Sequence, residues 1–237
     1  MVIDPRYPAK RLALTVQLDK QSVNDDIEAF GFPPEDLVFR WDSREGRAPA
    51  EARYRARLAE RGFELNGDML SVDYQWVIDR SGPKVRHVAA GLRQVARRHG
   101  YEPGRGHLGV LASFVQGLKY QIPTQRRQTP SGRTVETTGV LMPLEALAAG
   151  WGDCDTKCLL FASLLARRRS AELILLVGND HMFVGVQAPP RQNDRFVKVR
   201  NLRYVLVELT TPWALGRISE QQWKAARRNS YRIVPVT

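Results

Sequence analysis

Residues 150–161 read GWGDCDTKCLLF and contain both cysteines of the chain. Glycines come before Cys154 and a leucine-rich run follows it, so the pattern predicts a tight turn that leads into a helix with Cys154 in its first turn. The first N–H groups of a helix have no intrahelical acceptors, and the helix dipole adds partial positive charge there. Both effects favour a thiolate, and the polar neighbours of Cys154 predict an exposed side chain. Cys154 is therefore a candidate nucleophile, with a buried structural cysteine as the alternative.

Two later segments supply candidates for a base and an acid. Residues 181–186 and 204–210 are rich in β-branched and aromatic residues and predict strands. The first begins with His181, and the second carries Glu208 inside an apolar run, where a charged group needs a partner. Asp180 is the rival acid, but neighbouring residues of a strand point to opposite faces. Nucleophile, base and orienting acid are the three parts of a catalytic triad.

These motifs together resemble the transglutaminase-like superfamily of bacterial and archaeal cysteine enzymes. The similarity covers about residues 109–215 and lies in Gly-Asp-Cys-Asp before a leucine-rich helix, in His-Met-x-Val-Gly-Val and in Val-Glu-Leu-Thr. The resemblance implies a papain-like core of α+β class, in which the cysteine-bearing helix packs on an antiparallel sheet. It also implies a triad of Cys154 as nucleophile, His181 as base and Glu208 as third member, where the superfamily more often has Asp.

The order of predicted elements supports an α+β fold. We expect an N-terminal accessory lobe of mixed α and β structure in residues 1–83 and a catalytic core in residues 84–237. The lobe has a predicted strand at 11–18, a helix at 48–61 and a hairpin at 63–70. The core has predicted helices at 81–99, 108–118 and 142–147 and strands at 172–177, 181–186, 195–199 and 204–210. Residues 121–140 predict a long polar loop, which is either a substrate-gating lid or an inert excursion.

Two further residues bear on the site. Gln116, near the end of the predicted helix at 108–118, is a candidate oxyanion donor, with a solvated helix glutamine as the alternative. Cys158 lies one turn from Cys154 among leucines, which predicts a buried structural cysteine and gives poor geometry for a disulfide. Two cysteines at this spacing and four scattered histidines match no usual zinc pattern, so we expect no metal and no cofactor.

The chain is strongly basic, with a formal net charge of +11. Residues 151–237 hold 14 lysines and arginines against 7 aspartates and glutamates, including the basic runs at 167–169 and 191–203. This surplus is either a solvated face or a surface for an acidic partner or an anionic surface. No nucleic-acid-binding motif accompanies it, and no apolar run has the length of a transmembrane segment. Residues 1–10 lack the apolar core of a signal peptide, which favours the cytoplasm, with a cell-envelope domain of a longer parent as the alternative.

The sequence therefore predicts thiol-dependent acyl transfer on amide bonds of a protein or peptide substrate. Water as the acceptor gives a cysteine peptidase or amidase, and a lysine amine gives a protein transamidase. The competing hypothesis is a catalytically silent binding module that keeps the fold and docks an acidic partner through its basic C-terminal half.

Overall fold

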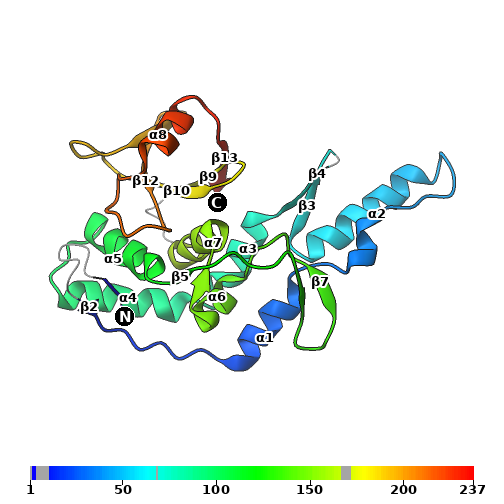
Figure 1. Cartoon of the computed structure of the whole chain (residues 1–237), viewed down its shortest axis with the longest axis horizontal. Helices are drawn as coiled ribbons and strands as arrows, with labels where there is room; N and C mark the ends of the chain where they lie inside the picture. Colours follow the sequence, from blue (N-terminus) through cyan, green and yellow to red (C-terminus); the bar gives the residue numbers. More distant parts are fainter. Residues whose placement is uncertain (1, 4–10, 68, 167–171) are drawn as a thin grey trace.

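The computed structural model describes residues 2–3, 11–67, 69–166 and 172–237 (Figure 1), so the basic run at 167–169 lies outside the described residues. Its centre is helix α7 (Cys154–Leu165), in which every residue except Asp155 is buried. Leucines and other apolar residues occupy all sides of α7, and a helix of this kind is stable only when other elements enclose it. The elements around α7 therefore define the fold.

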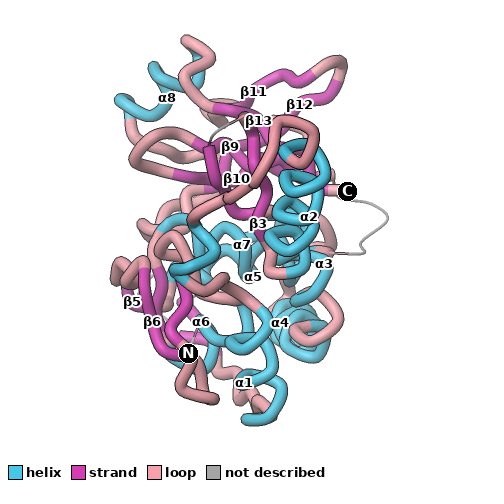
Figure 2. Tube along the Cα trace, turned by 90° about the vertical axis from the view of Figure 1, so that its right-hand side faces the viewer, coloured by secondary structure: helices cyan, strands magenta, loops and turns pink. Residues whose placement is uncertain are grey.

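A five-stranded antiparallel sheet covers one side of α7. Its strands are β9 (Leu173–Val177), β10 (Met182–Gln187), β11 (Phe196–Val199), β12 (Leu202–Val207) and β13 (Arg232–Val236). Their order is β11-β12-β10-β9-β13, which leaves β10 in the middle, paired with β9 and β12. The opposite face of the sheet carries a second apolar cluster that includes Ile218 and Ala226, and α8 (Glu220–Arg227) lies over it (Figures 1 and 2).

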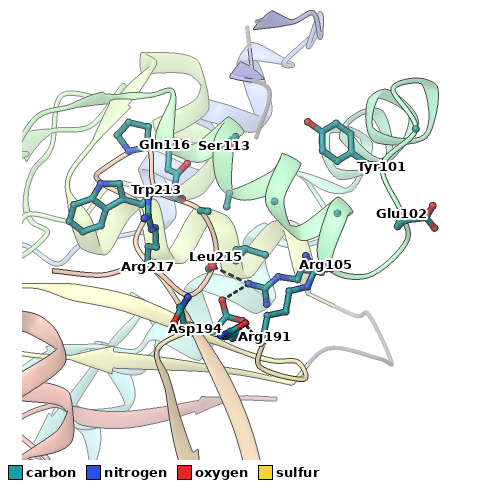
Figure 3. Close-up of a pocket in the computed structure, with 18 residues that line it drawn as sticks. Tyr101, Glu102, Arg105, Ser113, Gln116, Arg191, Asp194, Trp213, Leu215 and Arg217 are labelled. Carbon is teal, nitrogen blue, oxygen red and sulfur yellow. Dashed lines mark hydrogen bonds and ion pairs between the residues drawn. The ribbon is translucent and has the colours of Figure 1, made fainter. Parts of the chain in front are cut away.

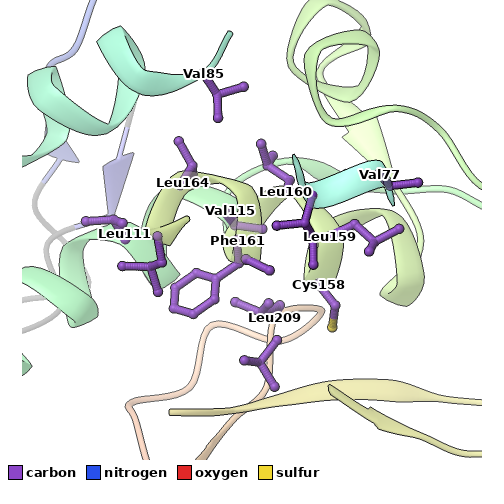
Figure 4. Packing of buried hydrophobic residues seen from close by; sticks show 14 of the residues in the cluster. Val77, Val85, Leu111, Val115, Cys158, Leu159, Leu160, Phe161, Leu164 and Leu209 are labelled. Carbon is purple, nitrogen blue, oxygen red and sulfur yellow. The ribbon is translucent and has the colours of Figure 1, made fainter. Parts of the chain in front are cut away.

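Four helices enclose the remaining sides of α7. They are α3 (Tyr74–Ser81), α4 (Arg86–Arg98), α5 (Arg105–Gln116) and α6 (Pro143–Ala149). Figure 4 shows side chains from several of these elements, among them Val77, Leu111 and Val115, around Leu160 and Phe161 of α7. An antiparallel sheet with helices packed against it is an α+β arrangement, as the sequence predicts.

The N-terminal part adds α1 (Lys20–Ala29), a 3-10 turn (Pro34–Leu37), α2 (Arg47–Glu60) and the hairpin of β3 (Phe63–Asn66) and β4 (Met69–Val72). Figure 1 shows α2 and this hairpin extending to one side of the helices around α7. One buried apolar cluster nevertheless runs from Leu12 through Phe30 and Phe63 to Leu209. The fully buried Asp26 also forms ion pairs with Arg80 and Lys84. The predicted division at residue 83 remains a prediction, and the core is continuous across it.

The described residues also include three short strand pairings. They are β1 (Val2–Ile3) with β2 (Arg11–Leu12), β5 (Lys119–Tyr120) with β8 (Trp151–Gly152), and β6 (Arg126–Gln128) with β7 (Thr134–Glu136). The predicted strand at 11–18 is wrong beyond Leu12, because residues 13–18 instead follow α4, where Leu14 approaches Gly91 and Gln17 accepts a hydrogen bond from His87.

Other predicted boundaries are also wrong. The strand expected at 204–210 is β12 (Leu202–Val207), which ends one residue before Glu208. The helix expected at 81–99 begins only at Arg86, because Gly82 and Pro83 lie in the turn between α3 and α4. A Cβ atom on Gly82 would lie 2.9 Å from that of Ala166, so the close approach to the end of α7 requires glycine there. The loop expected at 121–140 contains the β6–β7 hairpin.

Candidate active site

The local sequence fixes Cys154 at the start of α7. Gly150 ends α6 with a left-handed φ of 75°, a conformation that glycine adopts without steric cost. Strand β8 then pairs with β5, and at Gly152 the chain passes so close to Thr156 that a Cβ atom would overlap it. Asp153 caps α7 by accepting a 3.0 Å hydrogen bond from the Thr156 N–H. This turn and cap place Cys154 as the first helical residue.

His181 and Glu208 meet at one end of the central strands. His181 directly precedes β10, Glu208 directly follows β12, and these antiparallel strands are paired. The Nε2 atom of His181 lies 2.9 Å from Oε2 of Glu208, and because a carboxylate only accepts hydrogen bonds, Nε2 carries the proton. Oε1 of Glu208 accepts bonds from the N–H and hydroxyl of Thr210, at 2.8 and 2.6 Å.

The environment of Glu208 keeps it ionised. Burial, which leaves 2% of the residue exposed, raises the pKa of the Glu208 carboxyl. The hydrogen bond and charge of His181, with the two bonds from Thr210, outweigh burial and hold this pKa below its ordinary value. Glu208 therefore remains a fixed negative acceptor for the His181 ring.

Both cysteine sulfurs of α7 contact the backbone next to His181. The N–H of Met182 forms a hydrogen bond to the Cys154 sulfur, and Sγ of Cys158 donates to the Met182 carbonyl at 3.4 Å. The Cys154 thiol itself donates to Oδ1 of Asp155 at 3.2 Å, and the pKa of Asp155 responds to the charge of His181. Packing of α7 on β10 thus gathers Cys154, Asp155 and His181 in one place.

The structure overturns two expectations about Cys154. The residue is 7% exposed, so its polar neighbours did not indicate an exposed side chain. Burial raises the pKa of its thiol to about 12, and the negative charges of Asp155 and Asp153 add to the rise. These effects exceed the opposite influence of the Met182 N–H. The resting state is a neutral thiol, not a preformed thiolate.

The side chain of Gln116 makes two hydrogen bonds within the chain. Its side-chain nitrogen donates to the backbone carbonyls of Glu208 and Trp213, at 2.7 and 2.8 Å. An amide group has two N–H donors, and these carbonyls use both. In this arrangement neither N–H of Gln116 is free to bind an oxyanion, and the side chain ties α5 to the segment that carries Glu208. The oxyanion role of Gln116 remains a prediction.

The rival acid lies elsewhere. Asp180 is exposed, and in the described part of the chain no hydrogen bond or ion pair joins it to His181.

Sequence reasoning missed Thr210, although it stands two residues after Glu208. It also missed Lys157, which is 1% exposed and whose Nζ donates to the Leu118 carbonyl at 2.7 Å. Burial lowers the pKa of Lys157 and the charge of Glu208 raises it, so this ammonium group lies within the field of the site.

Two exposed apolar side chains lie on and just after β5, the strand that pairs with β8 before Cys154. Tyr120 and Ile122 are 48% and 71% exposed, and they flank Gln121, whose N–H bonds to the carbonyl of Gly152. Burial raises the pKa of the Tyr120 phenol, and the charges of Cys154 and nearby carboxylates add to the rise, which indicates that the ring is close to the thiol. These residues can contact a substrate.

Gln116 also lines a cavity of about 640 Å³ (Figure 3). It is lined by one side of α5 and by residues in the segments 191–194 and 212–217, while Cys154, His181 and Glu208 do not line it. Within the described ranges, no group of three or more histidines, cysteines, aspartates and glutamates is arranged to hold a metal ion. None of the helices described is both long and apolar enough to span a bilayer.

Comparison with protein-family models, with curated proteins and with solved structures finds no match to this chain. The evidence for function therefore consists of the site itself: a cysteine at a helix start, beside a histidine whose ring is held by a buried glutamate.

Proposed function

We propose that the chain is a thiol enzyme of the transglutaminase-like kind, with a papain-like core, that transfers the acyl group of an amide bond. The observation that carries the proposal is the 2.9 Å hydrogen bond between His181 and Glu208 next to the first residue of α7. A carboxylate bound to one ring nitrogen fixes the tautomer and stabilises the imidazolium that forms when the ring takes a proton. Because Nε2 is committed to Glu208, Nδ1 is the nitrogen that accepts the proton of Cys154.

The reaction begins from the neutral thiol. The Cys154 proton leaves its contact with Asp155 and moves to Nδ1 of His181, and the sulfur attacks the carbonyl carbon of the amide. The oxyanion that forms lies at the positive end of α7, where the first N–H groups lack intrahelical acceptors. His181 returns the proton to the leaving amine as the C–N bond breaks, and a thioester remains on Cys154.

A second nucleophile resolves the thioester. Water, deprotonated by His181, gives a carboxylic acid and makes the enzyme a peptidase or amidase. A lysine amine gives a new amide and makes it a transamidase. Peptide hydrolysis is the first expectation because water is present throughout the reaction.

A mass-spectrometric assay tests the proposal. The purified chain is incubated with a mixture of proteome-derived peptides, with and without cadaverine as an amine acceptor, and the products are compared with those of Cys154→Ala. Cysteine-dependent hydrolysis products support a peptidase, and cysteine-dependent cadaverine adducts support a transamidase. Identical product lists from the parent and Cys154→Ala would refute the proposal.

The pKa of about 12 at the Cys154 thiol favours one competing function. Nucleophilic catalysis requires a thiolate, and binding of a partner does not. A catalytically silent module that docks an acidic partner is therefore the second candidate. The same assay separates the two, because a binding module forms no cysteine-dependent products in the parent chain.

A further inference from the structure

The cavity beside the candidate active site has the size of a site for a small ligand or a substrate side chain. Its floor is the side of α5 that carries small residues, among them Gly106, Gly109 and Ser113. Gln116, one turn further along α5, lines the cavity and also donates to the backbone of Glu208. Gln116 therefore contacts both the cavity and the segment that carries Glu208.

Arginines dominate the charged lining. Arg105 is mostly buried, and its Nη2 bonds to Oδ1 of Asp194 at 2.8 Å and to the Leu215 carbonyl at 3.0 Å (Figure 3). Among the described residues, its buried Nη1 has no hydrogen-bond partner. Arg191 and Arg217 also line the cavity, and neither forms an ion pair with any other described residue. Guanidinium groups bind carboxylates through paired N–H donors.

The backbone adds to the same preference. α5 begins at the cavity with Arg105, and the 12-residue helix has neither an acidic residue in its first turn nor a side-chain cap to offset the positive end of its dipole. Two carboxylates oppose the arginines. Oδ1 of Asp194 pairs with Arg105, and its Oδ2 accepts a 2.6 Å hydrogen bond from the N–H of Arg191. Glu102 lies at the opposite end of the cavity from Trp213 (Figure 3).

We propose that this cavity binds an acidic side chain of the polypeptide on which the chain acts, a proposal that rests on the function proposed above. Trp213 lines the cavity, is 36% exposed, and its carbonyl is held by the same Gln116 amide that holds Glu208. A polypeptide whose scissile carbonyl lies at Cys154 can cross Trp213 and extend a carboxylate to Arg191 and Arg217. The chain would then select substrates with Asp or Glu near the bond that it attacks.

Calorimetric titration of the full chain carrying Cys154→Ala tests this subsite without any need for turnover. The probes are N-acetylated hexaglutamate, N-acetylated hexaglutamine and inorganic phosphate. We expect hexaglutamate to bind and hexaglutamine not to bind. Arg191→Gln and Arg217→Gln should each weaken hexaglutamate binding roughly three- to tenfold, since each removes a charge-assisted hydrogen-bond donor.

Arg228→Gln is the matched control, because it removes the same charge from an exposed position at the end of α8 that does not line the cavity, and it should change the affinity less than about twofold. Equal weakening by Arg228→Gln would overturn the subsite, and so would unchanged affinity in both cavity variants. Phosphate that binds as tightly as hexaglutamate would overturn the assignment to a polypeptide. A failed peptide assay would refute the proposed function alone, because hexaglutamate binding does not depend on Cys154 chemistry.

Discussion

Asp155 controls the ionisation of Cys154 at the scale of single residues. Its carboxylate accepts a hydrogen bond from the Cys154 thiol, with 3.2 Å between sulfur and oxygen. After burial, the charge of Asp155 contributes most to the raised pKa of Cys154. Asp155→Asn removes a negative charge, so the pKa of the thiol should fall. At pH 8 we expect alkylation of Cys154 to become roughly tenfold faster, since a neighbouring charge shifts a pKa by about one unit or more. Mass spectrometry of brief iodoacetamide labelling across a pH series measures the shift.

The control for this prediction is Asp180→Asn, which removes the same charge from an exposed position. It should leave the labelling profile of Cys154 unchanged. Cys158 should stay unlabelled in every folded variant because it is 0% exposed. A profile that moves to higher pH in Asp155→Asn would mean that Asp155 promotes ionisation of the thiol, contrary to the contacts seen.

Glu208→Gln should reduce turnover by about 10²–10⁴-fold while the chain stays folded. Thr210 donates twice to Oε1, so the glutamine oxygen is expected to face Thr210 and its NH₂ group to face His181. The ring then loses its acceptor and its counter-charge. Steady-state kinetics on a peptide found in the mass-spectrometric assay gives the ratio, with Asp180→Asn as control. Full activity in Glu208→Gln would exclude Glu208 as the orienting acid.

The depressed pKa of Glu208 also predicts a pH dependence of stability. A carboxyl whose pKa is lower in the folded state stabilises the fold above its unfolded pKa, near 4.5, and loses this contribution as the pH falls through the folded value. The stability of the parent relative to Glu208→Gln should therefore decrease on acidification below about pH 4.5. Urea denaturation of both chains at several pH values measures this difference, and a constant difference would contradict the direction of the shift.

At the scale of elements, Gln116 connects α5 to the segment after β12. Gln116→Leu would leave the Glu208 and Trp213 carbonyls without these donors, and the free energy of unfolding should fall by about 1–3 kcal/mol. Gln221→Leu, at an exposed position of α8, is the control and should change it by less than about 0.5 kcal/mol. If Gln116→Leu lost turnover with unchanged stability, that result would instead support the oxyanion role of Gln116.

Local chemistry explains which elements the sequence predicts well. The Asn66-Gly67 hairpin, the four strands from β9 to β12 and the start of α7 all carry their own turn, alternation or capping signals. Ser219 and Gln222 form a capping box, a local pattern from which the start of α8 could also be predicted. Residues 13–18 alternate like a strand, yet they lie along α4, since alternation does not specify a pairing partner.

The site shows a similar limit. The pairing of His181 with Glu208 could be expected from the order of the strands and from the need of a buried acid for a partner. The burial of Cys154 could not be expected from the sequence. It depends on β10 and on the helices packed around α7, which are distant in sequence, and on how Asp155 packs beside the thiol. The two carbonyl partners of Gln116 also lie more than ninety residues away, beyond any local pattern.

At the scale of the whole molecule, one apolar core joins the N-terminal part to the rest. α1 packs on α6 and α3 packs on α7, so residues 84–237 alone would expose surfaces now covered by Phe30, Val77 and Ile78. We expect this fragment not to fold cooperatively, and the full chain to unfold in a single transition. Circular dichroism and dye binding of the fragment, compared with the full chain, test this expectation. A fragment with a sharp unfolding transition would establish residues 84–237 as an independent domain.

The enclosure of α7 should make it one of the last parts of the chain to open on heating. Amide protons in a helix surrounded on all sides exchange with solvent only through openings that approach complete unfolding, whereas exposed elements exchange through small local fluctuations. The amides of residues 158–165 should therefore be among the slowest to take up deuterium. Because Cys154 begins the same helix, the position of its thiol should persist until this slow-exchanging part of α7 opens.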